Sequence, residues 1–119
     1  GKAILGARIL VMGMTFKENV ADIRNSKVVD IINELKDFGV EVDVVDPYAD
    51  PEEVKKMYGF RLIEKPLGNY DAVVVAVAHD AYQGLDEKYF KSLTCDKAVL
   101  VDVKGMYRDK IHELKYWSL

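Results

Sequence analysis

Apolar and polar positions follow two patterns along the chain, and each pattern predicts one kind of secondary-structure element. Short apolar runs predict strands, whereas apolar residues spaced three and four apart predict helices. The run DAVVVAVA at 71–78 is apolar at every position after Asp71, which is typical of a strand covered on both faces. Five segments in all predict strands: 8–12, 40–45, 60–64, 71–78 and 97–103, of which 60–64 has the weakest pattern.

The clearest helical spacing lies at 26–38. Asn25 or Ser26 is the expected N-cap of this helix, and Gly39 is its expected C-terminal stop. Five apolar side chains of the segment share one helical stripe: Val28, Ile31, Ile32, Leu35 and Phe38. Three further helices are expected: 51–58 with Asp50 as its N-cap and Pro51 at the first helical position, 86–93, and 109–117.

Strands that alternate with helices predict a mostly parallel sheet, because right-handed crossovers place the helices over its faces. We therefore predict an α/β fold, a Rossmann-like three-layer sandwich with a mostly parallel sheet of five or six strands. The five strands are expected in the order 3-2-1-4-5, and residues 1–119 in a single domain. Ligands of such sheets lie beyond the carboxyl ends of the strands, near the switch between strands 1 and 4. This rule selects the segments 13–27, 78–82 and 104–108.

Composition narrows the class of partner. The chain of 119 residues carries a net charge of -3, which argues against a general affinity for nucleic acid or for an anionic membrane. No apolar run approaches the roughly 20 residues of a membrane span, and no targeting signal is recognisable. The single cysteine, Cys95, fits a reducing compartment such as the cytoplasm and a packing role. Because the sequence starts in mid-pattern, we expect one domain of a longer protein.

Cations gather in two of the three selected segments of this acidic chain. Lys17 and Arg24 lie in 13–27, and Lys104 and Arg108 follow the strand at 97–103. Basic residues at one edge indicate an anion, of which phosphate is the usual one. Phe16 and Tyr107 are expected to offer a flat surface to a base or sugar. The alternative is that Arg24 only pairs with Asp22 to stiffen the loop and that Arg108 only begins a solvated helix.

Other residues that invite a catalytic or cofactor role have plainer interpretations. His79 at a strand end is interpreted as a hydrogen-bonded packing residue, and neither it nor His112 has metal-ligand spacing with Cys95. Asp46 resembles the ribose-binding acid of dinucleotide folds. However, Gly13 is not followed by the further glycines of G-x-G-x-x-G, which argues against NAD binding by this chain.

Four longer motifs carry a family resemblance. They are GMTFKENVADIRNSK at 13–27, DVVDPYAD at 43–50, AVVVAVAHDAY at 72–82 and LVDVKGMY at 100–107. Together they resemble the C-terminal, UDP-binding domain of the UDP-glucose/GDP-mannose dehydrogenase family, over nearly the whole chain. The form of these motifs is most similar to the bacterial branch that oxidises UDP-N-acetylhexosamines for surface polysaccharides. One departure is Ala21, where many relatives have proline.

The resemblance implies more than the residues themselves indicate. Complete members oxidise the sugar C6 alcohol to a carboxylate in two NAD-dependent steps, and they contain an N-terminal NAD-binding domain and a helical connector that makes dimers. The resemblance thus implies a UDP-sugar substrate. It also implies that NAD is bound, and that the catalytic residues lie, in a domain outside this chain. We therefore expect the chain alone to be inactive. The resemblance implies that Phe16 and Lys17 bind the substrate, and it supports the same role for Lys104. Arg24 is a fourth expected substrate-binding residue, on the charge pattern alone. The alternative is a non-catalytic regulatory or assembly module that reuses the fold.

Overall fold

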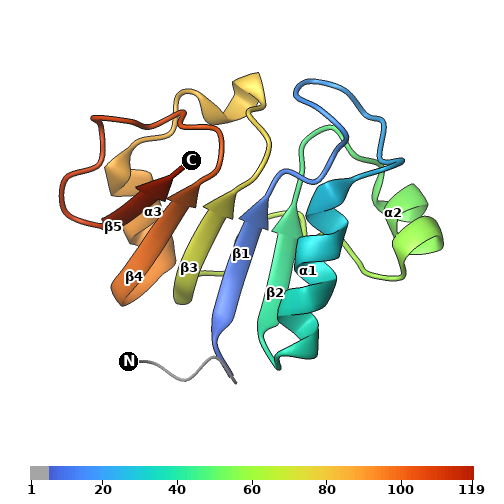
Figure 1. Ribbon diagram of the computed structural model, residues 1–119, viewed down its shortest axis with the longest axis horizontal. Coiled ribbons are helices and arrows are strands. Elements are labelled where there is room, and N and C mark those ends of the chain that lie inside the picture. The colour runs from blue at the N-terminus through green and yellow to red at the C-terminus, as the bar shows by residue number, and fades with distance from the viewer. Residues whose placement is uncertain (1–5) are drawn as a thin grey trace.

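Five parallel strands in the order β2-β1-β3-β4-β5 form the sheet of the computed structural model, which describes residues 6–119 (Figure 1). The switch point lies between β1 and β3, because the chain winds from β1 to β2 in one direction and from β3 to β4 and β5 in the other. The strands are β1 (Arg8–Met12), β2 (Glu41–Val45), β3 (Tyr70–Val75), β4 (Thr94–Asp102) and β5 (Lys115–Ser118).

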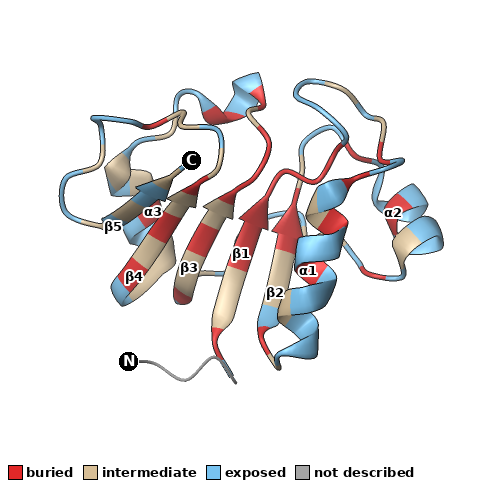
Figure 2. Ribbon diagram, viewed as in Figure 1, coloured by how far each residue is buried: buried red, intermediate tan, exposed pale blue. Residues whose placement is uncertain are grey.

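Helices cover both faces of the sheet. α1 (Lys27–Asp37) and α2 (Pro51–Tyr58) share a buried cluster with the β1 and β2 residues Val11 and Val44. On the other face, α3 (Glu87–Leu93) packs Phe90 among residues of β1, β3 and β4. A short 3₁₀ turn, η1 (Asp80–Tyr82), follows β3. Buried residues concentrate in the strands and on one side of each helix, so the predicted three-layer α/β sandwich is confirmed (Figure 2).

The central part of the predicted topology is confirmed. The predicted strands at 8–12, 40–45, 71–78 and 97–103 correspond to β1, β2, β3 and β4, and three of the predicted helices correspond to α1, α2 and α3. Asp50 caps α2 as expected, because its side chain accepts a hydrogen bond from the Glu52 N–H at 2.9 Å.

Two of the predicted elements are wrong, the strand at 60–64 and the helix at 109–117. Residues 60–64 do not form a strand. The segment runs beside β2, where the Ile63 N–H donates to the Val44 carbonyl at 2.9 Å, but it does not continue as a ladder. The predicted order 3-2-1-4-5 therefore fails at this end, and β2 is an edge strand. At the other end, 109–117 is not a helix but leads into β5. The Glu87 carboxylate accepts hydrogen bonds from three successive backbone N–H groups there, of residues 112–114, and holds the chain extended before β5.

The apolar stripe predicted on α1 is only partly directed at the sheet. Val29 and Ile32 are the buried residues of this helix, whereas Ile31 is 47% exposed and Phe38 is 66% exposed. At 100° per residue, a helix that directs residues 29 and 32 inward turns 31 and 38 towards solvent. Ser26 takes the N-cap position, but its hydroxyl donates to the Met14 carbonyl at 2.6 Å and makes no side-chain cap.

Gly13 at the end of β1 is predicted to be irreplaceable. Its φ is +93°, and a Cβ there would lie 2.7 Å from the Val77 Cβ and 3.0 Å from the Val77 backbone nitrogen. We expect Gly13→Ala to lower the free energy of unfolding by about 2–4 kcal/mol, from left-handed strain plus overpacking. Gly59→Ala is the matched control, because Gly59 has φ +82° but no atom within 4 Å of the added Cβ. Equal losses in the two variants, measured by urea denaturation, would show that the contact with Val77 is unimportant.

Candidate functional site

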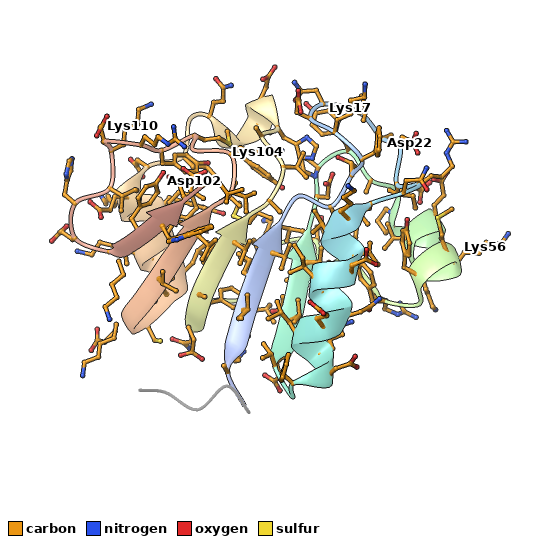
Figure 3. All side chains as sticks on the ribbon, in the orientation of Figure 1. Lys17, Asp22, Lys56, Asp102, Lys104 and Lys110 are labelled. Carbon is orange, nitrogen blue, oxygen red and sulfur yellow. The ribbon has the colours of Figure 1, made fainter. Side chains whose placement is uncertain are left out.

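A pocket of ≈ 350 Å³ lies beyond the carboxyl ends of β1, β3 and β4, at the edge that the sequence selects. The loop after β1, the start of α1, and the residues that follow β3 and β4 line it. Three of its lining residues are lysines: Lys17, Lys27 and Lys104. We call this the lysine pocket; Lys17 and Lys104 project from separate loops at the same edge of the sheet (Figure 3).

The lysine pocket is electropositive in an acidic chain. Its three lysines are accompanied by one acid, Glu18. α1 begins at Lys27 without a side-chain cap, so the positive end of its dipole and its first N–H groups lie at the same place. Phe16 is 52% exposed at the rim, and its ring centroid lies 6.0 Å from the Lys17 ammonium nitrogen. Cations, a helix N-terminus and an open aromatic ring suit an anion attached to a flat group.

The structure brings three of the four sequence-predicted site residues together. Phe16, Lys17 and Lys104 line the same pocket, but Arg24 is not among its lining residues. The Arg24 guanidinium donates to both oxygens of Asp22, at 3.0 and 3.1 Å, and this hydrogen bonding lowers the pKa of the Asp22 carboxyl. The ion pair that the sequence offered as the alternative thus exists. Ligand binding by each of the four residues stays a prediction.

Lys27 is a pocket residue that sequence reasoning missed. It is the first residue of α1, directly after the loop that carries Lys17, and it lines the same pocket. The sequence did contain a signal for Lys27. A basic residue that directly follows a helix N-cap after a strand lies at the same edge of the sheet as the preceding loop.

The Asp46 carboxylate anchors the loop of the lysine pocket. Its side chain is 0% exposed, and Oδ2 accepts hydrogen bonds from the backbone N–H groups of Met14 and Thr15 and from His79. The other oxygen, Oδ1, accepts from the N–H groups that follow at residues 48 and 49. The acceptors of Asp46 are therefore used within the protein, and this residue holds the loop where a dinucleotide fold would offer its acid to a ribose.

His79 connects this anchor to the middle of the loop. Its ring is fully buried, and Nδ1 accepts a hydrogen bond from the Asn19 N–H at 2.9 Å. Because Nδ1 accepts, the ring proton is on Nε2, which donates to Asp46 at 2.9 Å. The Asn19 side-chain oxygen in turn accepts from the Asp80 N–H at 2.8 Å. The structure agrees with the interpretation of His79 as a hydrogen-bonded buried residue, and we call Asn19, Asp46 and His79 the latch.

A second buried carboxylate, Asp102, fixes the turn that carries Lys104. Asp102 accepts hydrogen bonds from the N–H groups of Met106 and Tyr107, at 3.0 and 2.7 Å, and from the hydroxyl of Tyr116 in β5. Figure 3 shows Asp102 below the turn and Lys104 on it. Each of the two loops that supply lysines is therefore held by a buried aspartate at a strand end. Tyr107 is 1% exposed here, so the expectation that its ring offers a flat surface to a ligand is wrong.

Tyr116 gives this anchor a predicted pH dependence. Burial and the hydrogen bond to Asp102 raise the pKa of the Tyr116 hydroxyl to about 12, from a usual value of about 10. The folded state thus holds this proton more tightly than the unfolded chain does. The resulting stability is complete below pH of about 10 and is lost as the pH rises towards about 12. We expect Tyr116→Phe to flatten the fall of the unfolding free energy over that range, and parallel curves for the two proteins would contradict this role.

Other chemistry lies elsewhere in the described part of the chain. Cys95 is near the amino end of β4, at the opposite edge of the sheet, and its Sγ donates to Asp71 at 3.1 Å. Among residues 6–119 no cluster of His, Cys, Asp and Glu could hold a metal ion. Within the same residues no helix is long and apolar enough to cross a membrane.

Comparisons with known proteins agree on one family. Residues 10–109 match the UDP binding domain of the UDP-glucose/GDP-mannose dehydrogenase family. The chain is 39% identical over 111 residues to UDP-N-acetyl-D-glucosamine 6-dehydrogenase of Pseudomonas aeruginosa, covering 92% of this chain and 26% of that protein. It is 43% identical over 107 residues to Protein CapL of Staphylococcus aureus, covering 89% and 25%. It thus spans about a quarter of the length of these relatives.

The solved structures show the same fold. NDP-N-acetyl-D-galactosaminuronic acid dehydrogenase from Methanosarcina mazei Go1 superimposes with a TM-score of 0.84 at 23% identity, over 100% of this chain and 25% of that one. UDP-N-acetyl-mannosamine dehydrogenase Cap5O from S. aureus gives a TM-score of 0.76 at 22% identity, over 95% and 26%.

Proposed function

The chain belongs to the UDP-glucose/GDP-mannose dehydrogenase family as its UDP-binding domain, and from this premise we propose that its lysine pocket binds the diphosphate of a UDP-sugar. The observation that carries the proposal is the convergence of three lysines and the N-terminus of α1 at the switch point of the sheet. A diphosphate is the part of a nucleotide-sugar that such donors recognise most strongly.

The proposal gives each residue a part. Lys17, Lys27 and Lys104 are flexible point charges around the diphosphate, and Phe16 contacts the base or the sugar. Arg24 remains a prediction, because its guanidinium is bound to Asp22 and a nucleotide contact would require that pair to open. The latch keeps the backbone of the loop fixed, so that the side chains of Phe16 and Lys17 are presented from a rigid base.

We propose further that the whole protein is an NAD-dependent dehydrogenase that oxidises a UDP-N-acetylhexosamine or UDP-glucose to the uronic acid, for surface polysaccharide. The relatives at 38–43% identity include UDP-N-acetyl-D-glucosamine 6-dehydrogenases, which supports this substrate class. In this proposal the enzyme is cytoplasmic and dimeric, and an N-terminal domain outside these residues binds NAD.

The residues of this chain do not fit a dinucleotide. The Asp46 carboxylate is fully used in the latch, and the turn at Gly13 has no second glycine where a pyrophosphate would need close backbone approach. We therefore expect the chain to be inactive alone. Incubation with NAD and UDP-N-acetylglucosamine, followed at the NADH absorbance, should give no signal. Turnover that disappears in Cys95→Ser would overturn this assignment.

Titration of the isotope-labelled chain with UDP tests the binding proposal. Backbone signals of 15–18, 25–28, 76–77 and 103–104 should shift together, and uridine, which lacks phosphate, should shift them much less at equal concentration. Signals of α3 and β5 provide the internal control. The absence of any shift at millimolar UDP would favour the alternative, a non-catalytic module that reuses the fold.

A further inference from the structure

A second and larger pocket, of ≈ 600 Å³, lies beyond the ends of β1 and β2, mainly towards the α3 side of the sheet. Met12 and Val45 form its floor at the ends of β1 and β2, and Tyr82 and Tyr89 form one wall. These four residues belong to the α3 side of the sheet, whereas the lysine pocket lies at the start of α1 on the other side. We call this second pocket the tyrosine pocket, and none of the functions above uses it.

The hydroxyl of Tyr82 has no partner. The side chain lines the tyrosine pocket, the residue is 6% exposed, and its oxygen is the buried side-chain polar atom left without a hydrogen bond among residues 6–119. Buried polar groups are nearly always bonded, so an unpartnered one marks a place where a partner is missing. Burial raises the pKa of Tyr82, so the hydroxyl stays protonated and can donate.

Hydrogen bonds on both sides of Tyr82 fix its backbone. Its N–H donates to the His79 carbonyl at 3.0 Å, and its carbonyl accepts from the buried Tyr107 hydroxyl at 2.6 Å. The ring also packs edge-on against His79, with centroids 5.5 Å apart. The Tyr82 ring is therefore held in place at the wall of the pocket while its hydroxyl stays without a partner.

The charges around the tyrosine pocket exclude an anion. Its lining contains two carboxylates, Asp46 and Glu64, and no lysine, arginine or histidine. The oxygens of Asp46 are already bonded to the loop and to His79. The remaining walls are apolar and include three prolines: Pro47, Pro51 and Pro66. The lysine pocket has the opposite character, so one nucleotide-sugar does not suit both pockets.

We propose that the tyrosine pocket is a second ligand site, for an uncharged and largely apolar molecule with a flat ring and one hydrogen-bond acceptor that meets Tyr82. The pocket volume is within the usual range for small-molecule sites, about 300–1,000 Å³, and tyrosine and proline walls favour a ring.

Benzamide and benzoate test the charge and shape of the ligand on the 119-residue chain with labelled methyl groups. The two probes have the same size, but benzoate is an anion. Benzamide should shift the methyl signals of Met12, Val45 and Ile63, and benzoate at equal concentration should not. Equal shifts with both probes, or none with benzamide up to its solubility, would overturn the proposal. UDP should leave these methyl signals unmoved, so failure of UDP to bind does not affect the result with benzamide.

Tyr82→Phe tests the hydroxyl directly. The variant keeps the ring and should fold normally, because the oxygen that it removes has no partner. We expect its affinity for benzamide to fall about threefold to tenfold, as for the loss of one net hydrogen bond. Tyr48→Phe is the matched control, since Tyr48 is 37% exposed and does not line the pocket. An unchanged affinity in Tyr82→Phe, or an equal fall in both variants, would contradict the role of Tyr82.

Discussion

Asp46→Ala is expected to lower the free energy of unfolding of this chain by about 3–5 kcal/mol. The substitution leaves donors stranded on two segments, the N–H groups at residues 14 and 15 and those at 48 and 49, and it also removes the acceptor of His79. Each buried donor that is left unpaired costs about 1–3 kcal/mol, although water can reach some of them once the loop loosens. Urea denaturation followed by circular dichroism gives the value.

Asp22→Ala is the control for Asp46→Ala. Asp22 lies in the same loop and also accepts hydrogen bonds, but its side chain is 38% exposed and its partner is Arg24. An exposed pair of this kind contributes little to stability, because water and salt screen it. If the two substitutions cost the same free energy, the latch does not hold the loop and the account of Asp46 is wrong. A loss in Asp46→Ala together with weaker UDP binding would link the latch to the lysine pocket.

Lys17→Ala is expected to raise the KM of the complete enzyme for its UDP-sugar much more than it lowers kcat. Lys17 is proposed to contact phosphate equally in the ground state and the transition state, and such uniform binding affects KM. One charge-assisted contact is worth about 1.5–3 kcal/mol, which corresponds to a rise in KM of about 10-fold to 150-fold. Steady-state kinetics with purified full-length enzyme measure both constants.

Lys56→Ala provides a matched control for Lys17→Ala. Lys56 is an exposed lysine on α2, and Figure 3 shows it at the right edge of the molecule, away from Lys17 and Lys104. Its removal changes the net charge equally but should leave KM unchanged. A large fall in kcat for Lys17→Ala with an unchanged KM would place Lys17 in the chemical step and would contradict the binding role.

The centre of the fold and the edge strand β2 could be predicted from the sequence, but the edge strand β5 could not. β1, β3 and β4 have neighbours on both sides and helices over their faces, so their sequences are dense in apolar residues. An edge strand has one neighbour and a weaker pattern. β5 has four residues, and what keeps its approach extended is the contact with Glu87, which lies 27 positions before Leu114. No local pattern reveals such a contact.

The location of the candidate site could be predicted from the sequence, but the contacts that hold its loops could not. The rule for parallel sheets located the loops of Lys17 and Lys104 correctly, because it depends on strand order near the switch point alone. The role of Asp46 could not be read, since an acid at a strand end can bind a ribose or hold a loop. The difference is decided by its partners Met14 and His79, which lie 32 and 33 positions away.

The latch also makes the lysine pocket a late product of folding. Asn19 and His79 are 60 positions apart, so the loop has no acceptor for its Asn19 N–H until β3 has paired with β1. Contacts between such distant positions form slowly, because the intervening chain must first be closed into a loop. A growing polypeptide that has not yet produced residue 79 therefore has the lysines of the first loop but not the frame that orders them. Nucleotide binding by this domain would then begin only once its sheet is assembled.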